Sequence, residues 1–147
     1  MTIDQHLATI DLLRAREFPA RSGVSDVGFG GPGFHIAPLA VSAGLGTGDG
    51  AERERWAEDL DAWKEAIAQR LDDRWGEGLR WWSLTVGVRK ARGEEIPEPW
   101  ATLGDLVDEL YLWRPDGTGR WVALGVAERD GADEIRLLAA VTDRDPP

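Results

Sequence analysis

The sequence predicts an α+β fold, in which an antiparallel sheet of about four strands carries one long amphipathic helix, with an N-terminal helix and a glycine-rich segment beside them. Three observations lead to this prediction. Residues 51–75 repeat apolar side chains at helical spacing, the segments after residue 110 alternate like strands between tight turns, and eight tryptophans are available for a core. The length fits one domain, 1–147, made of the N-terminal helix (1–17), the glycine-rich segment (18–50) and an α+β core (51–145).

A first helix is expected from Ile3 to Glu17. Thr2 and Gln5 form a capping-box pattern, in which each side chain satisfies a backbone N–H of the other residue. Apolar residues then follow at helical spacing: Ile3, Leu7, Ile10 and Leu13. Pro19 is expected to end the helix, because proline cannot continue the helical hydrogen bonds.

Residues 18–50 contain nine of the 18 glycines. Within them, residues 34–41 are expected to form a strand, and Pro38 favours an edge position because proline lacks an N–H. Two interpretations remain open: an ordered cover over the core, or a mobile linker that leaves the first helix as an appendage. The apolar content favours the ordered cover. The residues concerned are Phe29, Phe34, Ile36, Leu39 and Val41.

Residues 51–75 give the clearest element. Their apolar stripe at helical spacing consists of Trp56, Leu60, Trp63, Ile67 and Leu71. Gly76 and Gly78 are expected to end this helix. The opposite face is acidic and is expected to be solvated; it carries Glu54, Glu58, Asp61, Glu65 and Asp72.

The remaining chain predicts the sheet. Residues 79–88 alternate and are expected to form one strand, followed by a loop (89–100) and a short helix (103–110). Further strands are expected to begin at Tyr111 and to span 121–128 and 135–142, with turns at 116–119 and 130–133.

The alternation also predicts which sheet residues pack against which cover. The long helix is expected to bury Trp82, Leu84, Val86, Val122, Leu124, Ile135 and Leu137. The other sheet face is expected to carry Trp81, Trp113 or Tyr111, Trp121, Ala123 and Gly125. The first helix or residues 18–50 are expected to cover that second face. If neither covers it, the exposed aromatic patch would mark a partner surface.

The formal net charge of −10 limits the kinds of partner. A non-specific nucleic-acid binder needs positive charge to displace counterions from phosphate, and anionic membrane surfaces repel an acidic protein. We therefore expect no nucleic acid and no membrane, and the sequence has neither an apolar run of spanning length nor a signal-peptide pattern. The absence of cysteine is consistent with the cytoplasm, and the preference for arginine over lysine is typical of a high-GC bacterial genome.

Motifs that carry chemistry are weak in this sequence. Residues 28–33 match the dinucleotide pattern G-x-G-x-x-G, but no helix is expected after them, so we interpret them as a structural loop. Ser42 lies in a faint nucleophile-elbow pattern that lacks the usual histidine order. His6 is expected to be exposed and His35 to be a satisfied polar residue in a strand. We predict no catalytic residues, no cofactor and no metal site.

The best candidate for a functional surface is the acidic stretch 94–109. It contains no Lys or Arg, and its acidic residues are Glu94, Glu95, Glu98, Asp105, Asp108 and Glu109. Trp100 lies in the middle of the stretch. One interpretation is a solvated acidic loop and helix. The other is a docking surface, in which negative charge steers a basic partner and Trp100 anchors it.

These features favour a non-enzymatic acidic module that masks a basic protein partner, such as a toxin, as bacterial immunity proteins and antitoxins do. This is an analogy of type, because no motif ties the chain to a named family. An alternative is a small-ligand domain or minor enzyme with an anion pocket near the glycine-rich segment, using Arg80, Arg89, Arg92 or His35. A third is a structural subunit of a bacterial assembly. The oligomeric state is not determined by the sequence.

Overall fold

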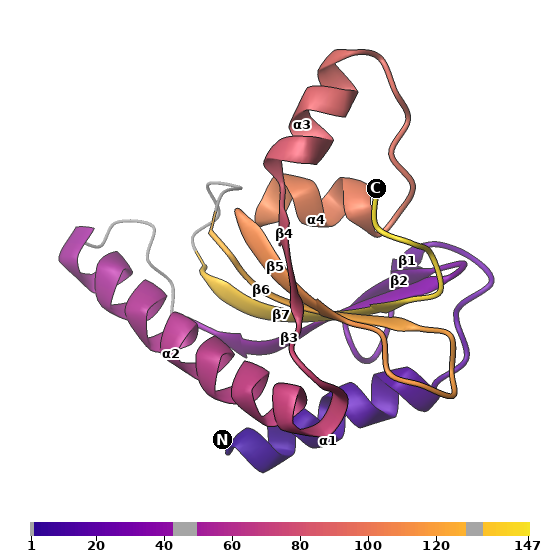
Figure 1. The fold of residues 1–147 in the computed structure, drawn as a ribbon. Helices are drawn as coiled ribbons and strands as arrows, with labels where there is room; N and C mark the ends of the chain where they lie inside the picture. The colour runs from indigo at the N-terminus through magenta and orange to yellow at the C-terminus, as the bar shows by residue number, and fades with distance from the viewer. Residues whose placement is uncertain (1, 43–49, 129–133) are drawn as a thin grey trace.

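The structure, a computed structural model, describes residues 2–42, 50–128 and 134–147 and is built around one antiparallel sheet of seven strands (Figure 1). In spatial order the sheet reads β1-β2-β3-β7-β6-β5-β4. The strands are β1 (Gly23–Val24), β2 (Phe29–Gly31), β3 (Phe34–Val41), β4 (Leu79–Trp82), β5 (Glu109–Trp113), β6 (Trp121–Ala127) and β7 (Arg136–Thr142). The helices are α1 (Ile3–Ala15), α2 (Gly50–Trp75), α3 (Leu84–Ala91) and α4 (Trp100–Leu106).

The prediction of about four strands is wrong, because the sheet has seven. The glycine-rich segment supplies three of them, and β3 has the bounds expected for the strand over residues 34–41. β1, β2 and β3 form a meander, and β3 pairs with β7 from Phe34↔Thr142 to Val41↔Arg136. Residues 23–41 therefore build one side of the sheet rather than a cover over it. The glycines of residues 43–49 lie outside the described residues.

Pro38 fits its strand because β3 is internal to the sheet over only part of its length. Pairing with β2 ends at Ile36, so beyond that residue β3 pairs with β7 alone. The register shifts between Pro38 and Ala40, as expected for a bulge. Proline within a sheet is tolerated at such a bulge.

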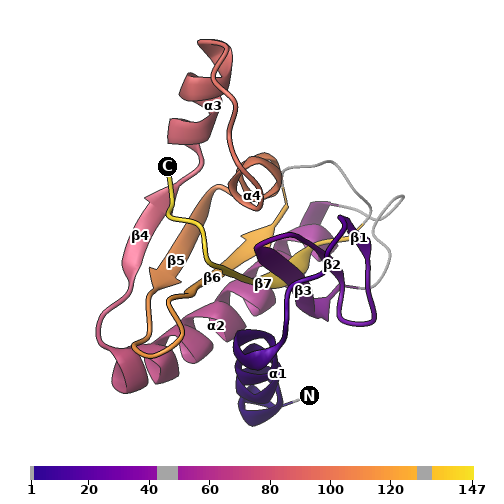
Figure 2. The ribbon, with the colours of Figure 1, turned by 90° about the vertical axis from the view of Figure 1, so that its right-hand side faces the viewer.

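The sheet is covered on both faces, so the molecule has three layers (Figure 2). β7 shows this directly. Leu137, Ala139 and Val141 face the core under α1 and α2, whereas Leu138 and Ala140 face the core under α4. A strand that is buried on both faces has a nearly continuous run of apolar residues, and the sequence of β7 has such a run.

The first face carries α1 and α2, as the amphipathic stripe of residues 51–75 predicts. Leu60, Ile67 and Leu71 are buried, and the tryptophans of the stripe are partly buried. Of the sheet residues expected opposite them, four lie in this core: Val122, Leu124, Ile135 and Leu137. Tyr111 and Trp113 also face α2.

α1 lies beside α2 and is held by its ends. The predicted capping box between Thr2 and Gln5 is confirmed, and the helix ends at Ala15, two residues before the expected end. Arg70 and Arg74 of α2 reach Asp4 and Asp11 of α1 at 2.9 and 3.0 Å. Arg120 donates to the carbonyl oxygens of Leu13 and Arg16, which satisfies acceptors at the helix C-terminus.

The second face is covered by α4, not by the first helix or residues 18–50 as the sequence predicts. Trp100 and Leu103 of α4 pack against Trp81, Leu112 and other sheet residues. The expected cover was wrong because residues 3–15 pack on the first face, and residues 23–41 belong to the sheet itself.

The expected strand 79–88 ends at Trp82, and residues 84–91 form α3 instead. The last pair of β4 and β5 is Trp82↔Glu109, because β5 begins there. Past Ser83 the backbone has no partner strand in the described structure, and the helix satisfies its polar groups internally. Figure 1 shows α3 projecting above α4, away from the sheet.

The remaining elements lie close to their predicted positions. The short helix expected over 103–110 spans Trp100–Leu106, and Glu109 and Leu110 open β5. β6 and β7 match the last two predicted strands to within one residue at each end. The predicted turn at 130–133 lies outside the described residues. None of the helices in the described part of the chain combines the length and apolarity needed to cross a membrane.

Candidate functional site

The six predicted acidic residues are spread over several parts of the fold. Glu94 and Glu95 are exposed in the loop after α3, and Glu98 is half-buried just before α4. Asp105 lies on α4 and Asp108 follows it, both exposed; Glu109 begins β5 and is half-buried. They therefore do not form the one continuous stretch that their order in the sequence indicates.

Two of these carboxylates have cations from α3 beside them. Arg89 lies 3.3 Å from Glu94, and Lys90 lies 3.1 Å from Asp105. The stretch 94–109 contains no Lys or Arg, but the fold brings Arg89 and Lys90 of the preceding helix next to it. The local negative potential at Glu94 and Asp105 is correspondingly reduced.

Trp100, the predicted anchor, is fully buried. Its side chain is 0% exposed and packs against Trp81, with 5.5 Å between ring centroids. A side chain without exposed surface cannot fill a partner's pocket. In this structure Trp100 instead closes the core under α4.

Trp82 is the tryptophan that the fold exposes. It ends β4 and is 53% exposed, although its alternation predicted burial under the long helix. Three other large apolar side chains of β4 and α3 are also exposed, namely Leu79, Leu84 and Val88. Half of the exposed large apolar residues in the described structure thus fall within residues 79–88.

Two hollows flank Trp82. The first, here called the α3–α4 hollow, has a volume of about 430 Å³ and is lined by Trp82, Ser83, Leu84, Val86, Gly87, Gly104, Asp105 and Asp108. The second, the α2–β5 hollow, has a volume of about 280 Å³ and is lined by Asp61, Lys64, Arg80, Trp82, Asp108, Glu109, Val126 and Glu128. Trp82 and Asp108 line both. Three of the predicted site residues, Asp105, Asp108 and Glu109, are therefore brought to the exposed tryptophan.

Lys64 is a buried cation at the α2–β5 hollow, with a side chain only 6% exposed. Its Nζ lies 2.8 Å from Asp61 Oδ1 and 3.5 Å from Glu109 Oε1. Burial by itself lowers the pKa of Lys64, but the hydrogen bond to Asp61 and the charges of Asp61 and Glu109 outweigh it, so the pKa lies above its usual value. Lys64 is therefore charged at neutral pH and does not act as a base there.

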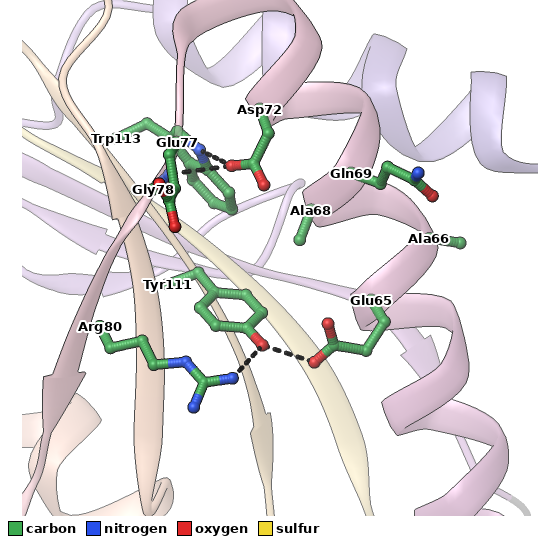
Figure 3. Close-up of a pocket in the computed structure, with 10 residues that line it drawn as sticks. All are labelled: Glu65, Ala66, Ala68, Gln69, Asp72, Glu77, Gly78, Arg80, Tyr111 and Trp113. Carbon is green, nitrogen blue, oxygen red and sulfur yellow. Dashed lines mark hydrogen bonds between the residues drawn. The ribbon is translucent and has the colours of Figure 1, made fainter.

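A third hollow lies next to Arg80 and extends along α2 towards the C-terminus of that helix (Figure 3). It is a cleft of about 610 Å³ between α2 and the strands β4 and β5, lined by Glu65, Ala66, Ala68, Gln69, Asp72, Glu77, Gly78, Arg80, Tyr111 and Trp113. We refer to it as the α2–β4 cleft. Glu65 and Asp72, which the sequence assigns to a solvated face, turn towards the sheet here.

Two hydrogen-bonded groups form the wall of the α2–β4 cleft (Figure 3). The Tyr111 hydroxyl donates to Glu65 Oε1 at 2.6 Å and accepts from Arg80 at 3.1 Å. Asp72 Oδ1 accepts from Trp113 Nε1 and from the Gly78 N–H, each at 2.9 Å. These bonds tie α2 to the edge of the sheet.

Tyr111 and Arg80 of the α2–β4 cleft keep their ordinary protonation states near neutral pH, because the pKa of each is raised. Burial and the hydrogen bond to Glu65 raise the pKa of Tyr111, although Arg80 acts in the opposite direction. The phenol therefore stays protonated. This part of the cleft wall therefore presents a neutral phenol between a carboxylate and a guanidinium.

The other sequence motifs have structural roles. Residues 28–33 form β2 and the turn into β3, with a strand rather than a helix after them. Ser42 is buried, and its Oγ accepts the N–H of Ile135 at 2.9 Å. Within residues 2–42, 50–128 and 134–147, no three acidic or histidine side chains are placed to hold a metal ion.

Both histidines are buried. His6, which the sequence predicts to be exposed, is 2% exposed and meets Trp63 edge-on at 5.6 Å between ring centroids. His35 lies with its Nε2 3.2 Å from the Glu17 carbonyl oxygen and its Nδ1 without a hydrogen-bond partner. Neither is placed to contact a ligand from solvent.

One hollow lies beside the glycine-rich segment, where the sequence placed an anion pocket as an alternative. It has a volume of about 410 Å³, and its lining is mostly apolar: Gly28, Phe29, Ile36, Pro38, Thr102, Leu106, Arg136 and Leu138. The cation here is Arg136, and none of Arg80, Arg89, Arg92 and His35 lines it.

Comparison with known proteins gives no relative. No family model matches the chain, and neither the curated proteins nor the solved structures contain a significant match. A functional proposal for this protein therefore rests on the geometry of the described residues alone.

Trp82 is the residue that sequence reasoning missed. A signal was present: Leu84 and Val88 are spaced as on one helix face, and Arg89, Lys90 and Ala91 are helix formers. If the sequence prediction had placed a helix from residue 84 onwards, Trp82 would have been the last residue of the strand and would not have been assigned to the core. The burial of Trp100 had no comparable local signal.

Proposed function

We propose that this protein is a non-enzymatic acidic binding module that masks a basic protein partner, with Trp82 as the anchor of the contact. The single observation that carries the proposal is the position of Trp82, half-exposed between two hollows that are rimmed by Asp105, Asp108 and Glu109. Interface contacts centre on exposed aromatic anchors, and surrounding charges steer the partner.

The charge around Trp82 supports a basic partner. The α2–β5 hollow has four carboxylates and two cations in its lining, and the whole chain carries a net charge of −10. Arginine or lysine side chains of a partner would meet both the carboxylates and the face of the indole, which attracts cations. The mechanism is occlusion: the partner's basic surface is covered and loses access to its own target.

This proposal keeps the class expected from the sequence and changes the anchor. Small acidic proteins that cover a basic toxin, such as immunity proteins and antitoxins, are the functional type that fits. We also propose that the protein acts in the cytoplasm, in keeping with its lack of cysteine. Trp100 no longer belongs to the proposed surface, and Asp105, Asp108 and Glu109 remain in it.

The test is a comparative capture from lysate of the source cells at low salt. The tagged wild-type protein is compared with Trp82→Ala and with Asp105→Asn/Asp108→Asn. We expect one basic protein to be retained in stoichiometric amount by wild type. Its affinity should fall by about 30-fold or more in Trp82→Ala, because removal of an anchor residue costs about 2 kcal/mol or more.

The matched control is Glu54→Gln/Glu58→Gln, which removes the same formal charge from exposed positions of α2. This control should retain the partner as wild type does. Equal weakening by both double variants would mean that only net charge matters and would reject the site. Retention of no protein by wild type would reject the masking function itself.

A second function is favoured by the apolar hollow beside the glycine-rich segment. Phe29, Leu106 and Leu138 line it together with Arg136, a combination suited to an apolar carboxylic acid. Thermal unfolding with a panel of such acids tests it, since a ligand that binds the folded state raises the Tm. A shift that disappears in Leu138→Ala but persists in Trp82→Ala would support this site, and no shift across the panel would reject it.

A further inference from the structure

We infer that the partner binds by adding an extended segment to the outer edge of β4, as an eighth strand whose residues alternate between basic and apolar. This inference rests on the proposed masking function and names the form of the partner's contact. Addition of a strand to an open sheet edge is a known mode of recognition, in which backbone hydrogen bonds supply affinity and alternate side chains supply specificity.

The edge itself is open. β4 is the last strand of the sheet and pairs only with β5 among the described residues. In Figure 2 it forms the outer left-hand side of the sheet, with no labelled element beyond it. An unpaired strand edge presents a row of backbone donors and acceptors, which proteins normally protect with charge, bulges or a cover.

β4 is poorly protected against addition of a strand. Its pairing with β5 runs without a register shift from Leu79↔Leu112 to Trp82↔Glu109. Leu79 is 60% exposed and Trp82 is 53% exposed, so one apolar side chain stands open on each face at the two ends of the strand. Arg80 is the only charged residue of the strand.

The surroundings of this edge select a cationic segment. On the α2 side of the sheet, the α2–β4 cleft and the α2–β5 hollow are lined by seven carboxylates and two cations. The carboxylates are Asp61, Glu65, Asp72, Glu77, Asp108, Glu109 and Glu128. A second copy of this chain would bring a like-charged surface to the same edge, which disfavours pairing of β4 with itself.

The two faces of β4 define the alternation. Arg80 and Trp82 point to the α2 side, whereas Leu79 and Trp81 point to the α4 side. A residue of the added strand opposite Trp82 faces the indole and the acidic hollows, so arginine or lysine fits there. A residue opposite Leu79 faces an exposed apolar side chain, so an apolar residue fits there.

The experiment uses a synthetic peptide of about eight residues, a common strand length, with alternating arginine and valine. Its control has the same sequence with alternate backbone amides N-methylated, which keeps side chains and charge but removes donors. We expect the control to bind the full chain at least about tenfold more weakly, because two or three intermolecular hydrogen bonds are lost. Amide hydrogen exchange of residues 79–82 should slow with the unmodified peptide.

Several outcomes overturn the inference. Equal affinity of the two peptides means that charge alone holds them, protection of α3 rather than β4 places the contact elsewhere, and no binding of either peptide removes the edge as a site. A dimer whose formation protects β4 at high protein concentration would make a second copy the occupant. The masking function is tested independently of the strand addition, by the capture from lysate. It is rejected if the wild-type protein retains no basic protein there.

Discussion

At the scale of single residues, buried charge and exposed aromatic surface define the candidate site. Lys64 is placed among the carboxylates of Asp61, Glu65 and Glu109, and it also lies 5.2 Å from the centroid of the Tyr111 ring. One cation thus holds together residues of α2 and β5. The neighbouring Trp82 is left half-exposed, so the fixed charges are presented to solvent next to an apolar surface.

Lys64→Met should destabilise the protein by about 2–3 kcal/mol. Removal of one partner of a buried ion pair leaves uncompensated charge, and the usual cost of about 3–5 kcal/mol is reduced here because Asp61 and Glu65 remain half-exposed. The measurement is denaturant unfolding at neutral pH.

The other lysine of the chain provides the control. Lys90 pairs with Asp105 at 3.1 Å, and both side chains of this pair are exposed. Lys90→Met should therefore cost less than about 1 kcal/mol. Equal effects of the two substitutions would show that Lys64 does not organise the site.

At the scale of elements, the position of α3 depends on a close approach to α4. A Cβ on Gly104 of α4 would lie 2.9 Å from Val86 Cγ1, and that valine side chain is buried. A Cβ on Gly87 of α3 would meet nothing within 4 Å. The two glycines thus differ in whether packing requires them. Both line the α3–α4 hollow beside Trp82.

Gly104→Ala should lower the free energy of unfolding by about 1–3 kcal/mol, because the extra methyl group overpacks the helix contact. Gly87→Ala should raise it by about 0.5–1 kcal/mol, because alanine favours a helix. Thermal and denaturant unfolding of the two variants measure this difference. A stabilising Gly104→Ala would contradict the α3–α4 packing.

At the scale of the whole molecule, both histidines are buried in their neutral form. Burial is the main cause that lowers the pKa of His6 and of His35. For His35, hydrogen bonds to the backbone of Arg16 and Glu17 act in the opposite direction, but the pKa still lies below its usual value. In the unfolded chain a histidine has a pKa of about 6.5. The unfolded state therefore binds more protons than the folded state as the pH falls towards and below that value.

Between a pH of about 7.5 and about 5.5, the free energy of unfolding should accordingly fall as the pH decreases through about 6.5. His6→Gln and His35→Gln should each reduce this slope, even where they lower stability overall. The measurement is denaturant unfolding between pH about 7.5 and about 5.5. Stability that is independent of pH over this range, or that rises on acidification, would contradict the burial of the histidines.

The functional surface could be predicted only in part. The sequence identifies Asp105, Asp108 and Glu109 as candidates because carboxylates without neighbouring cations in the chain stand out. The sequence could not show which tryptophan these carboxylates surround. Trp100 and Trp82 differ in exposure only because of contacts with elements that are distant in sequence. Trp100 is covered because α4 lies on Trp81, and Trp82 is exposed because β4 has no outer neighbour in the described part of the sheet.

The sequence by itself determined the elements whose signal is local. The capping box of α1, the apolar stripe of α2 and the alternation in β6 follow from periodicities within one segment, and they hold in the structure. Tertiary structure alone decided the number of strands and the cover of each face. It also decided which tryptophan meets solvent, because strand pairing and burial depend on neighbours far away in the chain, as β3 with β7 and Trp81 with Trp100 demonstrate.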